Sequence, residues 1–434
     1  MIRKPEGLMM PHNAICDTIS LWLRANCFYV THPELFSPHA NDVLLHQHEL
    51  HRKAVQNMSS QDKAYNRYKP KLTLATRFCN NKVEAGLYIE LSLPKLLYGE
   101  NLHEVTDSDF SQIITSLQQI LAVMGVDVTE DVLKGAEVNR IHYGKNILLK
   151  KGIWCDFIMK DIEKAKVSKI YDSGHTDYRN DGHCIRFHTK YHEFAIYDKI
   201  KDLKQQNKSP SRSLEDEVHR IYQCIDFDAI GNMQVFRIET RLNSVKAIRG
   251  AIKRAGMIIS SCTFEELFNS LIAKALNLNN WRTILQAMQP LACLQDDLVT
   301  MWMRLSSKYK PLKCLQILGL RNLMEVVGCR FITEHLKDAP TAINLFRELK
   351  SFKPQFSYKE QLYDDITKAI AENNVIVLPD LTCHKSEAII SEDLYADLDE
   401  EKQESVQKFQ SWTDLDVQQR KQLNYSNKNF INNI

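Results

Sequence analysis

Four short segments of the chain alternate apolar and polar side chains with a period of two, and this pattern limits what the chain can fold into. The segments are 87–92, 138–143, 193–199 and 236–242. Successive side chains of a strand point to opposite faces of a sheet, so each segment would place apolar residues on one face and polar residues on the other. We therefore predict a sheet with an apolar face against a core and a separate polar face.

The order of strand-like and helix-like segments favours an α+β fold. The first part of the chain combines a further strand, 15–23, with an amphipathic helix, 110–124, whereas the chain beyond about Cys262 shows mainly helical periodicity. A length of 434 residues suits two or three domains. We therefore predict an antiparallel-sheet domain at 1–258, a mostly helical domain at 259–382 and a tail at 383–434.

Three further segments carry more local predictions. The polar segment 203–213 is rich in Lys, Gln and Ser and is predicted to be a loop. The region 312–336 resembles two helices separated near Gly319, the layout of a helix-turn-helix that binds duplex DNA, although ordinary helix packing explains the same pattern. The basic helix predicted at 245–255 could lie along phosphates or present a solvated face.

Charge is unevenly distributed along the chain, although the net charge is only +2. Lys and Arg outnumber acids between about Lys134 and Arg254, whereas the segment from Glu387 to Glu404 is strongly acidic. That acidic segment could compete with a nucleic acid for a basic site, bind another protein, or only keep the chain in solution.

The cysteine pattern and the hydropathy narrow the cellular setting. The eleven cysteines form no C-x-x-C pair and no zinc-finger spacing, which favours reduced thiols in a cytoplasmic protein. The sequence has no stretch of about 18 apolar residues and no signal-peptide core, so we expect no membrane partner.

The predicted polar face would gather the groups that metal-assisted phosphoryl transfer needs, provided that the strands share one antiparallel sheet. Carboxylates and an imidazole can hold Mg²⁺ or Mn²⁺, and the metal polarises a phosphate. A tyrosine can attack phosphorus and keep a covalent link, while lysine and arginine neutralise charge and anchor phosphates. The side chains on this face are Glu90, Arg140, His142, Tyr197, Lys199, Arg237, Glu239 and Arg241.

The same charges also have an interpretation without catalysis. Charged side chains are usual on a half-exposed sheet face, and a pair such as Arg237 and Glu239 could be an ordinary ion pair. Alternation alone therefore leaves a structural and a catalytic interpretation open.

Motifs in these segments add a family resemblance. They run in the order Ser92-x-Pro94-Lys95-x-x-x-Gly99-x-Asn101, Arg140-Ile-His142, Tyr197-Asp-Lys199 and Arg237-x-Glu239-x-Arg241. In order and spacing they resemble the gene-two/gene-ten family of filamentous-phage and plasmid replication initiators, over roughly residues 10 to 260. The helical second half resembles that family only loosely.

The resemblance implies a site-specific DNA nicking and joining enzyme that starts rolling-circle replication. It implies an antiparallel-sheet endonuclease fold of the rolling-circle initiator type, a covalent 5′-phosphotyrosine intermediate, and Mg²⁺ or Mn²⁺. The expected partners are origin DNA, as one strand of a supercoiled duplex, and the helicase and polymerase of a bacterial host cell.

Carried over residue by residue, the resemblance assigns roles. Tyr197 would be the nucleophile, Lys199 its phosphate partner, and Glu239 a metal ligand or its orienter, with His142 and Glu90 as further candidate ligands. Side chains near the turn or on the polar face would contact DNA. These expected DNA-binding residues are Lys95, Asn101, Arg140, Arg237 and Arg241.

Two features depart from a simple transfer of roles. His142 stands where the family commonly has an acid, and histidine can bind Mn²⁺ but brings no negative charge. Tyr191 and Tyr143 are rival nucleophiles, of which Tyr191 is expected at a turn and Tyr143 on the same face as Ile141. We prefer Tyr197 because it shares a face with Lys199.

Two other functions remain open. A DNA-binding replication regulator of the same fold would keep the sheet without cutting DNA. A transposase or mobilisation relaxase would use the same tyrosine chemistry on other DNA ends.

Overall fold

A computed structural model describes residues 13–376 with gaps. The gaps are 60–61, 63–67, 80, 166, 168–175, 180–182, 209–229, 293–297, 336–338 and 352–357. The described residues belong to one compact unit. The predicted tail at 383–434 lies outside the described residues. No helix in the described part is both long and apolar enough to cross a membrane.

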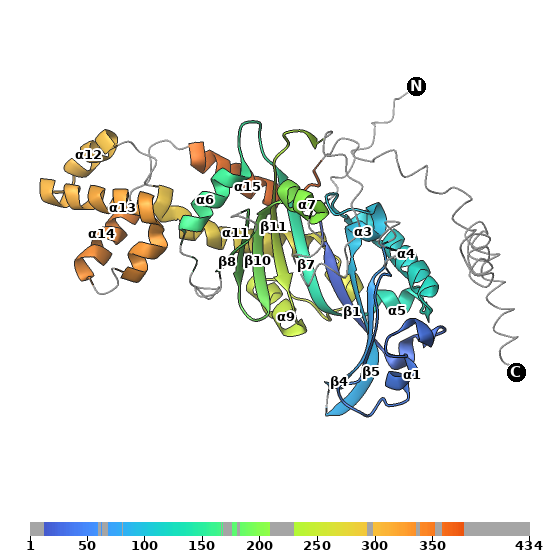
Figure 1. Cartoon of the computed structure of the whole chain (residues 1–434). Coiled ribbons are helices and arrows are strands. Elements are labelled where there is room, and N and C mark those ends of the chain that lie inside the picture. The colour runs from blue at the N-terminus through green and yellow to red at the C-terminus, as the bar shows by residue number, and fades with distance from the viewer. Residues whose placement is uncertain are drawn as a thin grey trace, which may run out of the picture. The chain divides into compact units, whose positions relative to one another are not determined.

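A nine-stranded sheet with antiparallel pairing throughout forms the centre of the molecule (Figure 1). In spatial order its strands are β3 (Lys53–Gln56), β4 (Lys71–Cys79), β5 (Lys82–Ser92), β1 (Thr18–Arg24), β7 (Glu137–Leu148), β11 (Val235–Leu242), β10 (His192–Asp198), β9 (Cys184–His188) and β8 (Thr176–Arg179). The prediction of one large antiparallel sheet in an α+β fold is thereby confirmed. A small second sheet pairs β2 (Tyr29–Val30) with β6 (Val126–Asp127).

The register of the strands places the predicted polar residues on one face. In one row across β1, β7, β11 and β10, Thr18 lies opposite His142, His142 opposite Arg241, and Arg241 opposite Glu193. Four residues away from Arg241 along β11, Arg237 pairs with Tyr197 on β10 and with Asn146 on β7, and the row of Glu239 lies between these two rows. Since directly paired residues project from the same side of a sheet, alternation predicted this shared face correctly.

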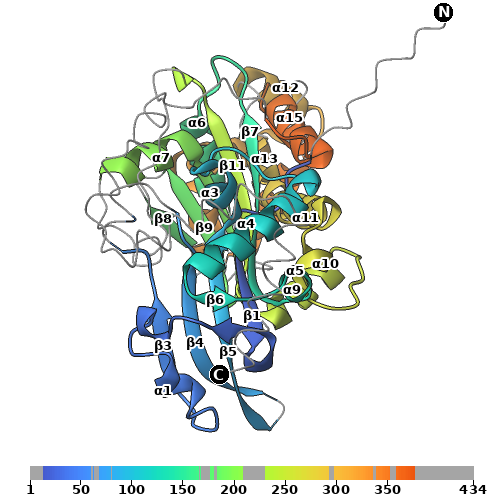
Figure 2. The same cartoon turned by 90° about the vertical axis from the view of Figure 1, so that its right-hand side faces the viewer.

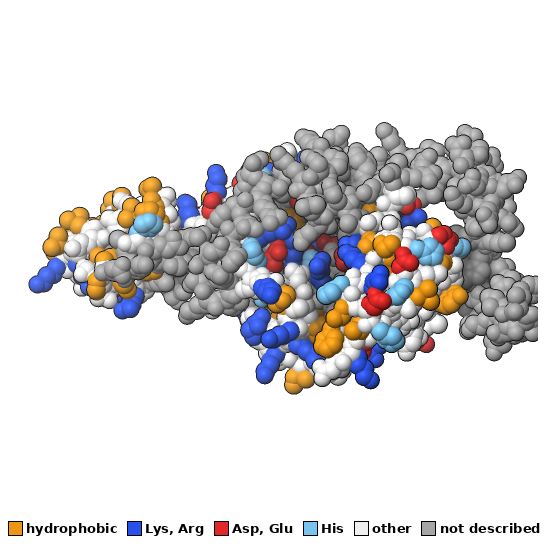
Figure 3. Space-filling view, turned by 60° about the horizontal axis from the view of Figure 1, so that its bottom comes forward, with side chains coloured by type: hydrophobic (Ala, Val, Ile, Leu, Met, Phe, Trp, Pro, Cys, Tyr) orange, Lys and Arg blue, Asp and Glu red, His pale blue; other side chains and the backbone are white. Residues whose placement is uncertain are grey.

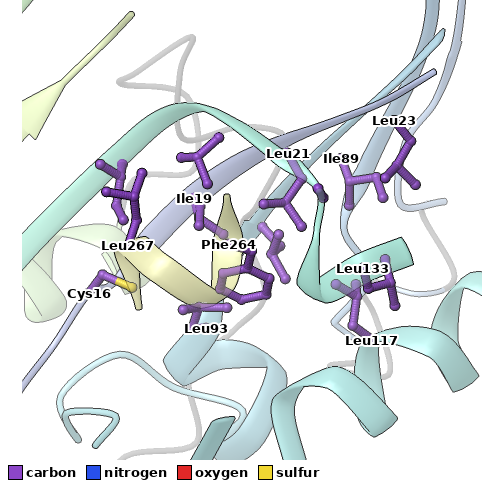
Figure 4. Close-up of a cluster of buried hydrophobic side chains, with 14 of the residues drawn as sticks. Cys16, Ile19, Leu21, Leu23, Ile89, Leu93, Leu117, Leu133, Phe264 and Leu267 are labelled. Atoms are coloured by element: carbon purple, nitrogen blue, oxygen red, sulfur yellow. The ribbon is translucent and has the colours of Figure 1, made fainter. Parts of the chain in front are cut away.

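Helices cover the apolar face of the sheet in two clusters. The first cluster packs α3 (Leu93–Tyr98), α4 (Phe110–Val123), α5 (Glu130–Lys134), α9 (Val245–Arg254) and α10 (Phe264–Leu267) against β1, β5 and β7. Figure 4 shows Ile19 and Leu21 of β1 meeting Leu117 of α4 and Phe264 of α10 in this core. The predicted helix 110–124 is confirmed; a capping box of Thr106 and Asp109 precedes it.

The second cluster joins the later helices to the other half of the sheet. It involves α6 (Cys155–Lys164), α11 (Ser270–Ala292), α12 (Leu298–Ser306), α13 (Pro311–His335), α14 (Pro340–Ser351) and α15 (Tyr358–Glu372). Trp281 and Ile284 of α11 are buried in one core with Phe236 and Ile238 of β11. The helices beyond residue 259 therefore share a core with the sheet. At the end of the sheet away from these later helices, β4 and β5 extend beyond the helical layer. The short helix α1 (Asn41–Leu44) packs against β4 there (Figure 2).

Two local predictions were wrong in part, and one open alternative is decided. The predicted loop at 203–213 begins inside helix α7 (Lys199–Lys208), because Lys and Gln are good helix formers and Ile200 and Leu203 are buried on one side. The sequence of segment 137–149 fits either a strand or a hairpin around Tyr143-Gly144, and the structure shows one strand, β7, that runs through Gly144. Helix α13 continues through Gly319 and breaks instead at Gly328, whose φ is 80°.

Candidate active site on the polar face of the sheet

The centre of the polar face is a hydrogen-bonded pair of Tyr197 and Glu239 from the adjacent strands β10 and β11. The Tyr197 hydroxyl donates to Glu239 Oε2 over 2.9 Å. Arg241 Nη2 donates to the same oxygen over 3.1 Å, and Arg241 Nη1 donates to Glu193 over 3.0 Å. Tyr197 is 6% exposed and Glu239 2%, so the pair lies inside the protein.

His142 joins this centre from β7. Its Nδ1 lies 3.3 Å from Glu239 Oε1, and its Nε2 lies 3.4 Å from the Asn243 side-chain oxygen. Tyr197, Glu239 and His142 therefore lie together, with Glu239 between the other two.

Arg237 forms a second layer of the site beneath Glu239. Its Nη2 donates to Asp17 over 2.7 Å, and its Nη1 donates to the Asn146 side chain over 2.9 Å. Its Nε lies 3.9 Å from Glu239 Oε2. The guanidinium lies so close to Gly144 that a Cβ there would collide with it, so glycine at this position makes room for the arginine.

Lys199 is the first residue of α7 and approaches the site from the end of β10. Its Nζ lies 5.9 Å from the centre of the Tyr197 ring. The side chain is 1% exposed and forms no ion pair within 4 Å with another described residue. Burial, with Arg237 nearby, lowers the pKa of Lys199 to about 8. At pH 7 the group is therefore an ammonium, and the carboxylates that offset its charge, such as Asp17 and Glu239, do not form an ion pair with it.

Burial and charge set the protonation states at the centre. Burial raises the pKa of the Tyr197 hydroxyl well above its ordinary value. Glu239 is buried too, yet Arg241, His142 and Arg237 hold the pKa of its carboxyl well below the usual range. Near neutral pH the site therefore contains a neutral phenol that donates to a carboxylate, beside two guanidinium groups and one ammonium.

Several predicted site residues lie elsewhere. Glu90 shares the polar face but sits two strands away from His142, opposite Ser20, and lies 3.9 Å from Lys71. Arg140 is in the same row as Glu90, on the other side of Ser20. Lys95 and Asn101 are largely buried, around the left-handed Gly99 that ends α3.

The two rival tyrosines are separated from the centre. Tyr143 is buried on the apolar face, where its hydroxyl donates to the carbonyl of Leu267 over 2.9 Å, as its alternation with Ile141 predicted. Tyr191 lies at the bend before β10 and is 45% exposed.

Sequence reasoning missed two contributors to the site. Asp17 precedes β1 and is two residues from both Ile15 and Ile19. Strict alternation therefore assigns it, wrongly, to the apolar face of the sheet. Asn146 projects from the same face as His142, and continuing the polar face four residues beyond His142 along β7 would have found it.

The donor set does not fit a divalent cation in this arrangement. Of the three predicted ligands only His142 and Glu239 meet, and no further His, Cys, Asp or Glu joins them among the described residues. Glu239 is already neutralised by Arg241 and Arg237, so a dication would lie next to two guanidinium groups. A requirement for Mg²⁺ or Mn²⁺ stays a prediction from the resemblance.

Comparisons of the chain with protein families, with curated proteins and with solved structures found no match.

Proposed function

We propose that this protein nicks and rejoins one strand of DNA through Tyr197, as the rolling-circle initiators that it resembles do. The observation that carries the proposal is the Tyr197–Glu239 hydrogen bond inside a cluster of Arg237, Arg241 and Lys199. A tyrosine nucleophile needs an acceptor for its proton and cations for the charge that develops on phosphorus, and this cluster offers both.

The proposed reaction links the DNA 5′ end covalently to the protein and frees a 3′ hydroxyl. Tyr197 Oη forms a bond to phosphorus, the bond from phosphorus to the 3′ oxygen breaks, and the phenolic proton passes to Glu239 Oε2. The departing 3′ oxygen takes a proton from solvent and becomes a free hydroxyl. The DNA 5′ end remains on Tyr197 as a phosphodiester, and attack by a 3′ hydroxyl reverses the steps and rejoins the strand.

The cations have separate roles in this proposal. Lys199 is the best candidate to contact a non-bridging phosphate oxygen, because its ammonium has no close ionic partner among the described residues. Arg241 and Arg237 keep Glu239 ionised and ready to accept the proton.

The burial of Tyr197 sets a condition on this chemistry. With 6% of the tyrosine exposed, a phosphate reaches Oη only after the site opens. Helix α7 starts at Lys199 and packs on β10 and β11, so a displacement of this helix would open the site (Figure 1).

A second candidate function is favoured by the same burial. Arg241 donates to Glu239 and Glu193, and Arg237 donates to Asp17 and Asn146. A structural polar network that never meets substrate would have the same contacts. A DNA-binding regulator without nicking activity would keep this network for stability alone.

The two functions are separated by one nicking assay. Supercoiled plasmid carrying the DNA that flanks the protein's own gene is incubated with the wild type, Tyr197→Phe or Tyr191→Phe, each with Mg²⁺, Mn²⁺ or a chelator. We expect open circles with the wild type and with Tyr191→Phe, and none with Tyr197→Phe. Binding without nicking by all three proteins would support the regulator. Loss of nicking only in Tyr191→Phe would identify Tyr191 as the nucleophile.

A further inference from the structure

Helix α9 presents a row of exposed cations at one end of the sheet. Lys246, Arg249, Lys253 and Arg254 are all exposed, and the helix contains no acidic residue. Its other side buries Ile248 and Ile252 in the core, so the orientation of the helix is fixed. Figure 3 shows lysine and arginine side chains gathered on this part of the surface.

The stability of the helix itself does not account for this charge. Cations near the C-terminal end, such as Lys253 and Arg254, are favoured by the helix dipole, but Lys246 lies in the first turn, where a cation is disfavoured. None of the four cations forms an ion pair with another described residue. The row is therefore available to an anionic partner.

An exposed aromatic ring continues this surface. Tyr191 stands at the bend between β9 and β10, with Lys190 Nζ 5.1 Å from the centre of its ring. The backbone N–H of Asn243, just before α9, donates to the Tyr191 carbonyl over 2.9 Å. At the other end of α9, Arg254 Nη2 lies 3.4 Å from His192 Nδ1. The bend and the helix thus form one connected surface.

We propose that this basic-aromatic surface, made of Lys190, Tyr191 and the four cations of α9, binds single-stranded nucleic acid. Cations spaced along a helix match a phosphate backbone, and an exposed tyrosine offers a base a stacking platform. Tyr191 precedes Tyr197 by six residues, so alternation places the two side chains on the same face. Six residues of extended chain span about 20 Å. This inference rests on the proposed function only for the role of the bound strand, which would lead toward Tyr197.

The test measures binding and needs no cleavage. A fluorescent single-stranded oligonucleotide of about 20 nucleotides is titrated with the full chain at several salt concentrations. We compare the wild type with the double variant Lys246→Gln/Lys253→Gln and with the control Lys160→Gln/Lys310→Gln, which removes two exposed lysines elsewhere. All four sites are on the surface, so each protein is expected to fold.

We expect the α9 variant to lose at least about tenfold in affinity and its salt slope to fall by about 1.4, or about 0.7 for each lost phosphate contact. The control should change neither value. Equal behaviour of the two variants overturns the proposal, as does tighter binding of polyglutamate than of the oligonucleotide.

A stacking variant and a nicking-dead variant separate this inference from the proposed function. Tyr191→Leu should weaken binding of the single strand about tenfold and leave duplex binding nearly unchanged, because paired bases are not available for stacking. Tyr197→Phe should bind like the wild type. If no nicking is found but the α9 substitutions weaken binding, the proposed function fails and this inference stands. If nicking is found but the α9 and Tyr191 substitutions do not affect it, this inference fails and the proposed function stands.

Discussion

Replacing Lys199 by methionine should stabilise the protein at neutral pH while removing its activity. The ammonium of Lys199 is 1% exposed and has no close counter-charge among the described residues. At about 1.36 kcal/mol per pKa unit, the fall from 10.5 to about 8 corresponds to a destabilisation of about 3 kcal/mol at pH 7. Methionine has a similar length and carries no charge, so Lys199→Met can recover up to that amount.

The sign of the pH dependence follows from the same pKa. Between pH 8 and 10.5 the unfolded chain holds a proton on Lys199 that the folded protein has lost, so wild-type stability rises with pH across this window. The methionine variant lacks this rise. Its advantage over the wild type should therefore shrink from about 3 kcal/mol at pH 7 to about 1 kcal/mol at pH 9.5.

Urea unfolding at pH 7 and 9.5 measures these differences, and Lys145→Met is the matched control. Lys145 is also 1% exposed, but its Nζ lies 2.9 Å from Glu104, so its loss leaves a buried carboxylate and should destabilise by about 3–5 kcal/mol. The reasoning is refuted if Lys199→Met destabilises as strongly as the control at pH 7, or if its effect does not change with pH.

Three further substitutions test the packing and charge of buried positions in the sheet. Glu239→Gln leaves Arg241 buried with a weaker partner and should cost about 3–5 kcal/mol in urea unfolding; a cost below about 1 kcal/mol would argue against a coupled cluster. Gly144→Ala places a methyl group against Arg237 and should cost about 1–3 kcal/mol, less when Arg237→Ala is also present; an undiminished cost in the double variant would show another cause. Burial lowers the pKa of His192 to about 4, so wild-type stability should fall as pH drops from 6.5 toward 4, and a His192→Gln variant with the same fall would contradict this assignment.

Alternation predicted which side chains share a face, because the period of two and the antiparallel pairing leave little freedom. It could not predict what covers that face. The pattern around Tyr197 and Glu239 looks the same whether the polar face is exposed or, as found, nearly closed. Burial depends on contacts distant in sequence, such as Asp17 with Arg237 across 220 positions.

Gly144 and Lys199 both matter to the site, but for structural reasons that their local sequence does not show. Gly144 suggested a hairpin, since glycine often marks turns, yet its role is to admit the guanidinium of Arg237 within a continuous strand. Lys199 was placed on the strand with Tyr197, yet it begins α7 and still faces the tyrosine. In both cases the cause is a side chain from another part of the fold, which local patterns do not contain.

The central claim is that Tyr197 carries the DNA during the reaction, and one measurement addresses it directly. An oligonucleotide from the nicked strand is reacted with the wild type, the covalent product is digested with nuclease and trypsin, and the peptide 191–199 is fragmented in a mass spectrometer. That peptide contains both Tyr191 and Tyr197, so the fragment ions decide between them. The account predicts a nucleotide on Tyr197, whereas a nucleotide on Tyr191, or nicking without any covalent product, would contradict it.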